Sequence, residues 1–439
     1  MNQPVKNPMT IAVVALGKIG LPLAVQFARK GHHVIGCDVN ATTVDLVNKG
    51  IEPFPGEAHL AEYLADVVKS GHLTATTDTT AAVAKAQAVV VVVPLFVDKD
   101  GVPDFGWMDD ATAKIASGLT KGTLVSYETT LPVGTTRNRF APALEKGSGL
   151  VAGKDFSLVF SPERVLTGRV FADLRRYPKL VGGIDDASTQ AGITFYESVL
   201  DFDDRPDLPE KNGVWNLKTS EASEMAKLAE TTYRDVNIAL ANQFAIFAES
   251  TNIDISKVIA ASNSQPFSHI HQPGIAVGGH CIPIYPRFYL WNDPKATVVR
   301  AAREANAGMP NHAVGLLKEE LGDLSGKTVA VLGISYRGGV KESAFSGIFP
   351  TVDALRAGGA KVLVHDPMYT DDEIKKYGFE PYSLGTAVDG VILQADHKEY
   401  KALGSENFPG VKAVVDGRRT LDSKKFSGVT FRVIGAPGA

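Results

Sequence analysis

The chain has 439 residues, of which 44% are hydrophobic and 21% are charged, and its formal net charge is −4. This composition is typical of a soluble globular protein with two or three domains. The small net charge gives no reason to expect a nucleic-acid partner or a membrane surface. Two cysteines cannot form a disulfide framework, the N-terminus does not resemble a secretory signal, and no apolar run could span a bilayer. We therefore expect a cytoplasmic protein without membrane contact.

The first half of the chain alternates between predicted strands and helices, as in a doubly wound α/β domain. Residues 9–16 form a continuous apolar run suited to a buried parallel strand, and a helix is expected at 21–30. Further strands are expected at 33–37, 87–93, 124–127 and 158–160.

The turn after the first strand reads Gly17-Lys18-Ile19-Gly20, and Ala15 stands where this motif usually begins with glycine. Gly17 would let a pyrophosphate approach the backbone, and Gly20 would let the helix pack against the strand. Asp38 follows the second strand, where its carboxylate can accept hydrogen bonds from ribose hydroxyls and would repel a 2′-phosphate. These residues predict a binding site for NAD rather than NADP.

The middle of the chain has a different residue pattern from the first half. Residues 201–212 are polar and turn-rich, which indicates a boundary, and a long helical pattern follows at 219–259. Ser220 is the expected N-cap of this helix, with Glu221 and Glu224 in its first turn.

A second α/β unit is expected after Gly322, with strands at 328–332, 361–365, 391–393 and 413–415. Two nucleotide-sized folds indicate two nucleotide-containing ligands. We predict three domains: an NAD-binding domain at 1–212, a central helical domain at 213–320 and a nucleotide-binding domain at 321–439.

Cys281 lies on a glycine-rich loop and is the candidate nucleophile, although a buried cysteine acting as a small hydrophobe is the alternative. Residues 128–136 and 161–164 follow strands, at the edge that carries ligands. The first segment could equally be a threonine-rich cap, and Glu163 beside Arg164 could be an ordinary salt bridge. Lys227, Thr231 and Arg234 share a helix face, for which a solvated charged surface is the alternative. No histidine spacing argues for a metal site.

Four motifs, in their order and spacing, resemble those of the nucleotide-sugar 6-dehydrogenases, the UDP-glucose/UDP-N-acetylmannosamine dehydrogenase family. They are ETTLPVGTT with Thr130, SPERVLTGR with Glu163, EMAKLAETTYRDVNIALAN with Lys227, and GGHCIP with Cys281. The resemblance implies two Rossmann-like domains joined by a central helical dimerisation domain with a long spine helix. It also implies NAD as cofactor, a UDP-sugar substrate and a homodimer.

The resemblance implies a four-electron oxidation of the sugar C6 hydroxyl through a thiohemiacetal and a thioester on Cys281. Lys227 would stabilise oxyanions or move protons, Glu163 would be the base, and Thr130 would help hold the hydrolytic water. The implied NAD contacts are Gly17, Lys18, Ile19, Gly20, Asp38, Pro94 and Thr130. The implied substrate contacts are Arg164, Val165, Lys227, Thr231, Arg234, Gly278, Tyr336 and Arg337.

The ERVL, GGHCI and RDVNIALAN sequences are more similar to the N-acetylhexosamine branch of the family, which makes uronate donors for surface polysaccharides. This favours UDP-N-acetylmannosamine as substrate, with UDP-glucose as the alternative. Three positions depart from the family pattern, Thr231 for asparagine, Tyr285 for aspartate and Ala344 for arginine. A catalytically impaired sugar-nucleotide-binding homologue is therefore a further alternative. Arg418 and Arg419 are additional candidates for substrate contacts, and His269 or His271 could replace the charge of a family His-Pro-Arg stretch.

Overall fold

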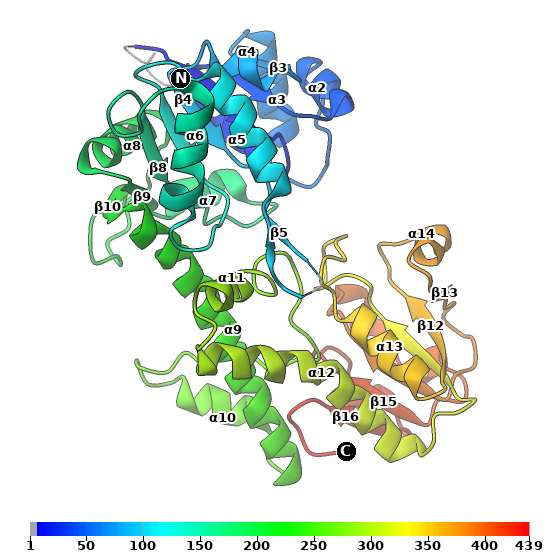
Figure 1. The fold of residues 1–439 in the computed structure, drawn as a ribbon. Helices are drawn as coiled ribbons and strands as arrows, with labels where there is room; N and C mark the ends of the chain where they lie inside the picture. Colours follow the sequence, from blue (N-terminus) through cyan, green and yellow to red (C-terminus); the bar gives the residue numbers. More distant parts are fainter. Residues whose placement is uncertain (1–6, 99, 439) are drawn as a thin grey trace. The chain divides into compact units, whose positions relative to one another are not determined.

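The computed structural model describes residues 7–98 and 100–438 (Figure 1). The chain divides into two compact units, residues 1–229 and 230–439, each with a sheet and its own hydrophobic core. The predicted α/β class is confirmed. The division into three domains stays a prediction. No helix among the described residues is both long and apolar enough to cross a membrane.

The first unit contains an eight-stranded sheet. Its strands are β1 (Thr10–Val14), β2 (His33–Cys37), β3 (Leu73–Thr76), β4 (Ala88–Val91), β7 (Leu124–Tyr127), β8 (Ser157–Phe160), β9 (Lys179–Gly183) and β10 (Val214–Thr219). The order β3-β2-β1-β4-β7-β8 is that of a doubly wound sheet, and these strands are parallel. β9 is antiparallel to β8, and β10 is parallel to β9. The loops after β1, β4, β7 and β8 therefore lie at one edge of the sheet, together with the start of β9.

Helices cover both faces of this sheet. They are α1 (Gly20–Arg29), α2 (Ala41–Asn48), α3 (Leu60–Lys69), α4 (Thr79–Val83), α5 (Gly106–Gly118), α6 (Ala141–Ser148), α7 (Val170–Arg176) and α8 (Asp186–Val199), with a π-helical turn at Thr136–Phe140 and a hairpin of β5 (Phe96–Val97) and β6 (Pro103–Asp104). Ile11 and Val13 join α1, α3 and α8 in one core. Ala12 and Val14 are also buried, on the opposite face. Burial on both faces explains why β1 reads as a continuous apolar run.

The second unit contains a six-stranded parallel sheet. Its strands are β11 (Thr328–Leu332), β12 (Lys361–His365), β13 (Glu380–Pro381), β14 (Gly390–Leu393), β15 (Ala413–Asp416) and β16 (Thr430–Val433). Their order, β13-β12-β11-β14-β15-β16, repeats that of the first sheet. The helices of this unit are α10 (Ile255–Ser262), α11 (Tyr285–Asn292), α12 (Thr297–Leu321), α13 (Ile348–Ala357) and α14 (Asp371–Lys376), with 3-10 turns at Lys398–Ala402, Ser405–Asn407 and Ser423–Lys425.

The long helix differs from the prediction in two ways. α9 (Ser220–Ser250) ends before a turn in which Asn252 has a φ of 60°, and α10 begins after Asp254, which caps it. One continuous helix over 219–259 is therefore wrong. The expected N-cap is also wrong, because the hydroxyl of Thr219, not Ser220, accepts a hydrogen bond from the N–H of Ala222. α9 contributes residues to both units (Figure 1).

Candidate active site

The turn after β1 has room for a ligand at one glycine and none at the other. A Cβ on Gly20 would lie 1.9 Å from the carbonyl oxygen of Ala15, so only glycine fits where α1 meets the strand. A Cβ on Gly17 would have no atom within 4 Å, so the fold does not require glycine there. Ala15 adopts a φ of 78°, which glycine would adopt without strain. The turn fits the close backbone approach of a dinucleotide phosphate.

Asp38 supports the turn as well as ending β2. One carboxylate oxygen accepts the N–H of Leu16 at 2.8 Å, and the other accepts the N–H of Asn40 at 2.9 Å. A carboxylate has about four lone-pair sites, so acceptor capacity remains for ribose hydroxyls. Pro94 is exposed after β4, and the hydroxyl of Thr129 donates to the carbonyl of Val93 at 2.7 Å. The expected NAD contacts therefore lie along one edge of the first sheet.

Thr130 is buried on a loop that α9 holds in place. The carboxylate of Glu224 accepts the N–H of Gly134 at 2.5 Å, the N–H of Thr136 at 2.9 Å and the hydroxyl of Thr136 at 2.7 Å. Glu224 is fully buried, and burial raises its pKa to about 7 despite these three donors. Glu224 is therefore a buried connection between the first turn of α9 and the loop of Thr130.

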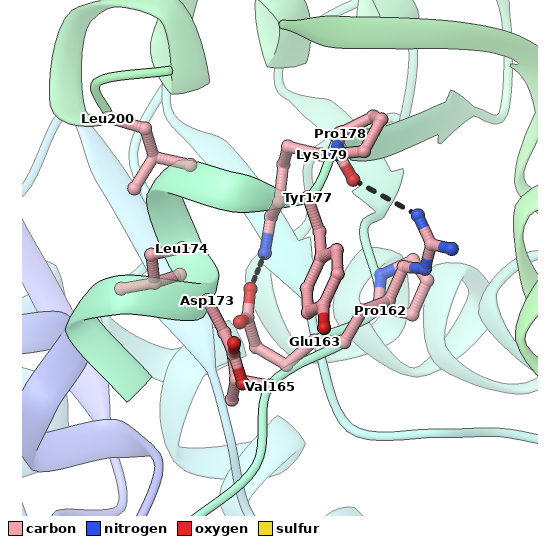
Figure 2. A pocket seen from close by; sticks show the side chains of 10 residues that line it. Pro162, Glu163, Val165, Asp173, Leu174, Tyr177, Pro178, Lys179 and Leu200 are labelled. Atoms are coloured by element: carbon pink, nitrogen blue, oxygen red, sulfur yellow. Dashed lines mark hydrogen bonds and ion pairs between the residues drawn. The ribbon is translucent and has the colours of Figure 1, made fainter. Parts of the chain in front are cut away.

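Glu163 is paired with Lys179. The ammonium of Lys179 donates to Glu163 and also to Glu128, the latter at 2.8 Å (Figure 2). Burial disfavours the charge on Lys179, but the attraction of the two carboxylates outweighs it and raises the pKa of Lys179. Burial also raises the pKa of Glu128 to about 8. Glu163 thus belongs to a buried cluster of one ammonium and two carboxylates.

Arg164 and Val165 line a pocket beside this cluster (Figure 2). Arg164 donates to the carbonyl of Pro178 at 3.4 Å, and Val165 packs against the core of the first unit. The remaining lining residues are Pro162, Asp173, Leu174, Tyr177 and Leu200, with Glu163, Pro178 and Lys179.

The helix face that carries Lys227 is not a solvated charged surface. Lys227 and Thr231 are 7% and 4% exposed, and only Arg234 is exposed. This burial excludes a solvated charged surface at Lys227 and Thr231, and the catalytic role of Lys227 stays a prediction. Lys227 belongs to the first unit, and Thr231 and Arg234 to the second.

The glycine loop before Cys281 is bound to the second sheet. The N–H of Ile275 donates to Gly417 at 3.1 Å, and the N–H of Gly279 donates to Ala344 at 2.9 Å. A Cβ on Gly278 would lie 2.6 Å from Tyr336, and one on Gly279 would lie 3.1 Å from its ring. These glycines therefore permit close packing on the C-terminal sheet. The N–H of Gly279 is bonded within the protein and is therefore not directed at a ligand.

Cys281 is exposed, whereas Cys37, the other cysteine, is buried. The carbonyl of Cys281 accepts the N–H of Tyr285 at 2.9 Å, which starts the turn into α11. Tyr285, where an aspartate was expected, thus lies one turn beyond the thiol. His280 approaches Glu342 at 3.5 Å. The thiol lies next to the carboxyl edge of the second sheet, and the buried-hydrophobe alternative is excluded.

Tyr336 and Arg337 follow β11, next to the point where the strand order of the second sheet reverses. In open α/β sheets this is where ligands bind. Arg418 and Arg419, the additional candidates for substrate contacts, bind other residues of the second unit. Arg418 donates to the carbonyls of Gln394 and Ala276, both at 2.9 Å, while Arg419 pairs with Asp254 at 2.9 Å. Both arginines have structural partners.

Burial and the nearby Arg234 lower the pKa of His271. The role of His269 or His271 as a replacement for the family charge stays a prediction. No group of three potential metal-ligating side chains is found in residues 7–98 and 100–438.

Three family models match the chain in order. The NAD-binding, central and UDP-binding domains of the UDP-glucose/GDP-mannose dehydrogenase family match residues 9–200, 221–308 and 330–423. The chain belongs to this family. As a member it is an NAD-dependent nucleotide-sugar dehydrogenase, which confirms the predicted enzyme class and cofactor.

Several relatives are similar over nearly their whole length. The UDP-N-acetyl-D-mannosamine dehydrogenase of Pyrococcus horikoshii is 32% identical over 97% of this chain and 99% of its own. The enzyme of that name from Salmonella typhimurium is 32% identical, over 90% and 95%. The solved structure of the P. horikoshii UDP-D-ManNAc dehydrogenase has a TM-score of 0.86 at 30% identity, covering 97% of this chain and 99% of its own.

Sequence reasoning missed Lys179, Glu128 as its partner, and the role of Glu224. Glu128 and Glu224 stood in recognised motifs, but nothing in their spacing shows which groups they contact. Lys179 is the first residue of β9, a strand whose direction the sequence does not reveal.

Proposed function

We propose that the protein oxidises the C6 hydroxyl of a UDP-N-acetylhexosamine, UDP-N-acetylmannosamine, to the uronate, with two hydrides passed to NAD per sugar. The relatives named UDP-N-acetyl-D-mannosamine dehydrogenase support this substrate. The observation that carries the proposal is Cys281, an exposed thiol on a loop bound to the carboxyl edge of the sheet in the UDP-binding domain. A two-electron alcohol dehydrogenase would need no such nucleophile.

Cys281, as thiolate, would add to the C6 aldehyde to give a thiohemiacetal, whose oxidation gives a thioester. The buried ammonium of Lys227 suits the stabilisation of an oxyanion. Glu163 would accept a proton from water, and Thr130 would orient that water, in the hydrolysis that releases the uronate. Tyr285 replaces the family aspartate, so this chain would complete hydrolysis without a carboxylate at that position.

The first unit would hold NAD, which accepts the hydride when bound. Gly17 would admit the pyrophosphate, Asp38 would bind the ribose, and Lys18, Ile19 and Pro94 would line the same edge. Tyr336 and Arg337 would contact the sugar nucleotide at the switch point of the second sheet, with Gly278 beside them. Arg164, Val165, Thr231 and Arg234 stay proposed substrate contacts by resemblance.

We also propose a homodimer formed through α9. Tyr233, Leu240, Phe244 and Phe247 are between 37% and 64% exposed and lie on one helix face. Exposed aromatic and aliphatic side chains in one row are typical of an interface between subunits.

The test is the amount of NADH formed from limiting UDP-N-acetylmannosamine, UDP-N-acetylglucosamine, UDP-glucose or GDP-mannose, followed at about 340 nm. Two NADH per UDP-N-acetylmannosamine are expected, because each oxidation transfers one hydride. The Cys281→Ser variant should bind the sugar nucleotide but lose uronate formation, since a hydroxyl is a far weaker nucleophile than a thiolate.

Cys37→Ser is the matched control and should keep activity, because that thiol is buried at the last residue of β2. One NADH per sugar would mean that oxidation stops at the aldehyde. Normal turnover in Cys281→Ser would contradict the covalent mechanism. Two NADH per sugar from UDP-glucose alone would mean that UDP-glucose, not UDP-N-acetylmannosamine, is the substrate.

A further inference from the structure

Lys179 carries a buried positive charge between two carboxylates. Its side chain is 4% exposed, that of Glu128 is fully buried, and that of Glu163 is 9% exposed. Figure 2 shows the ammonium pointing at the Glu163 carboxylate, at the wall of the pocket. Lys179 is therefore the direct partner of the proposed base.

On the side away from Glu163, the Lys179 ammonium is held by Glu128 and Tyr196, which do not line the pocket. Glu128 receives Lys179 on one oxygen at 2.8 Å and the phenol of Tyr196 on the other at 2.6 Å. That phenol is in turn 2.6 Å from the hydroxyl of Ser126. The ammonium also lies 4.6 Å from the centre of the Tyr196 ring. A buried lysine held by this many groups has little freedom to move.

The antiparallel direction of β9 produces this contact. Val159 pairs with Gly183 and Phe160 with Gly182, so the same register carried past the strand ends brings Glu163 opposite Lys179. The hydroxyl of Ser161 donates to the carbonyl of Leu180 at 2.7 Å, which keeps the register along this extension. The antiparallel pairing of β8 and β9 thus places Lys179 next to Glu163.

We propose that Lys179 is a positioning residue for thioester hydrolysis, which holds the Glu163 carboxylate in the orientation that accepts the proton of the attacking water. The inference rests on the proposed function, in which Glu163 is the base. In the step, the C–O bond to water forms and the C–S bond breaks. The sulfur leaves as the Cys281 thiolate with the bond pair, one water proton goes to Glu163, and the uronic acid is released. Lys179 neither gains nor loses a proton.

Lys179→Met removes the charge and keeps the length of the side chain. We expect kcat to fall at least about 100-fold, with the affinity for NAD unchanged. A rapid burst of two NADH per site should precede slow turnover, and intact mass should reveal the acyl group on Cys281. Lys179→Arg retains a cation and should recover at least about tenfold of the loss. Lys121→Met, an exposed lysine paired with Asp155, is the matched control and should leave kcat unchanged.

A double variant separates positioning from mere charge neutralisation. Lys179→Met leaves Glu128 buried without a cation, which can unfold the site. Lys179→Met/Glu128→Gln removes that problem, and we expect it to be stable and still slow, because Glu163 remains without its partner.

Wild-type kcat in Lys179→Met, or full recovery in the double variant, would overturn the inference while two NADH per sugar in the wild type upheld the function. No NADH from the wild type would overturn both.

Discussion

Single residues in this protein show which positions the fold requires and which it leaves to a ligand. Gly20 has no space for a side chain, whereas Gly17 has open space and is a glycine without a packing reason. Ala15 adopts a left-handed conformation that glycine would adopt more easily. The sequence identified all three positions from the motif, but only the structure separates their roles.

Gly17→Ala should weaken NAD binding by about tenfold or more, roughly 1.4 kcal/mol, because the new methyl group would occupy the space for the pyrophosphate. The thermal midpoint should change little, since the methyl group meets no protein atom. Titration calorimetry with NAD measures the first effect and calorimetric unfolding the second.

Gly315→Ala, another glycine with open space but inside α12, is the control and should leave NAD affinity as in the wild type. Equal NAD affinity in Gly17→Ala would mean that the dinucleotide does not approach this backbone.

At the scale of elements, two contacts between segments distant in the chain build the first unit's part of the site. α9 holds the loop of Thr130 through Glu224, and β9 brings Lys179 to Glu163. Periodicity and apolar runs identified β1, β2, β4, β7 and β8 to within two residues of their ends. They did not identify β9 or β10, because short strands at the sheet margin carry little pattern.

Glu224→Gln should destabilise the junction between α9 and residues 134–136 most strongly at low pH. An amide nitrogen cannot accept the N–H donors, which costs about 1–3 kcal/mol. Burial raises the pKa of Glu224 from 4.5 to about 7, so its contribution is fully present below pH 4.5 and is lost as pH rises through 7. The deficit of the variant should therefore shrink from pH 5 to pH 8, at up to about 1.4 kcal/mol per pH unit.

Amide hydrogen exchange at residues 134–136 measures this deficit. Glu221→Gln, one turn away, is the control. Burial opposes ionisation there, but the hydrogen bonds from Arg137, the backbone and Ser220 together with the charge of Arg137 outweigh it and lower the pKa of Glu221, so its deficit should be constant from pH 5 to pH 8. A Glu224→Gln deficit that grows with pH would contradict the argument.

Over the whole molecule, one strand order occurs twice, once in each unit. The family models assign NAD to the first unit and UDP to the second, so the same architecture serves two nucleotides. The loop of Cys281 is bonded to the second sheet, which connects the thiol to the UDP-binding unit. α9 belongs to both units and carries the exposed apolar row.

Phe244→Glu/Phe247→Glu should convert the proposed homodimer to a monomer at micromolar concentration, because two carboxylates per subunit would be buried without partners. Sedimentation velocity measures the mass. Gln243→Glu adds one charge to the same helix beside the apolar row and should leave the mass unchanged. A monomeric wild type, or a dimeric double variant, would contradict the interface.

The sequence by itself determined the fold class, the two nucleotide-binding sheets and the family, because periodicity and turn motifs involve only residues that are close together in the chain. Thr130, Glu163, Lys227 and Cys281 were found in the same way. Only the tertiary structure decided what these residues contact: Lys179 for Glu163, Glu224 for the loop of Thr130, and Tyr336 for the glycines before Cys281. The physical reason is that such partners depend on strand direction, register and close packing between distant segments, which no local pattern encodes.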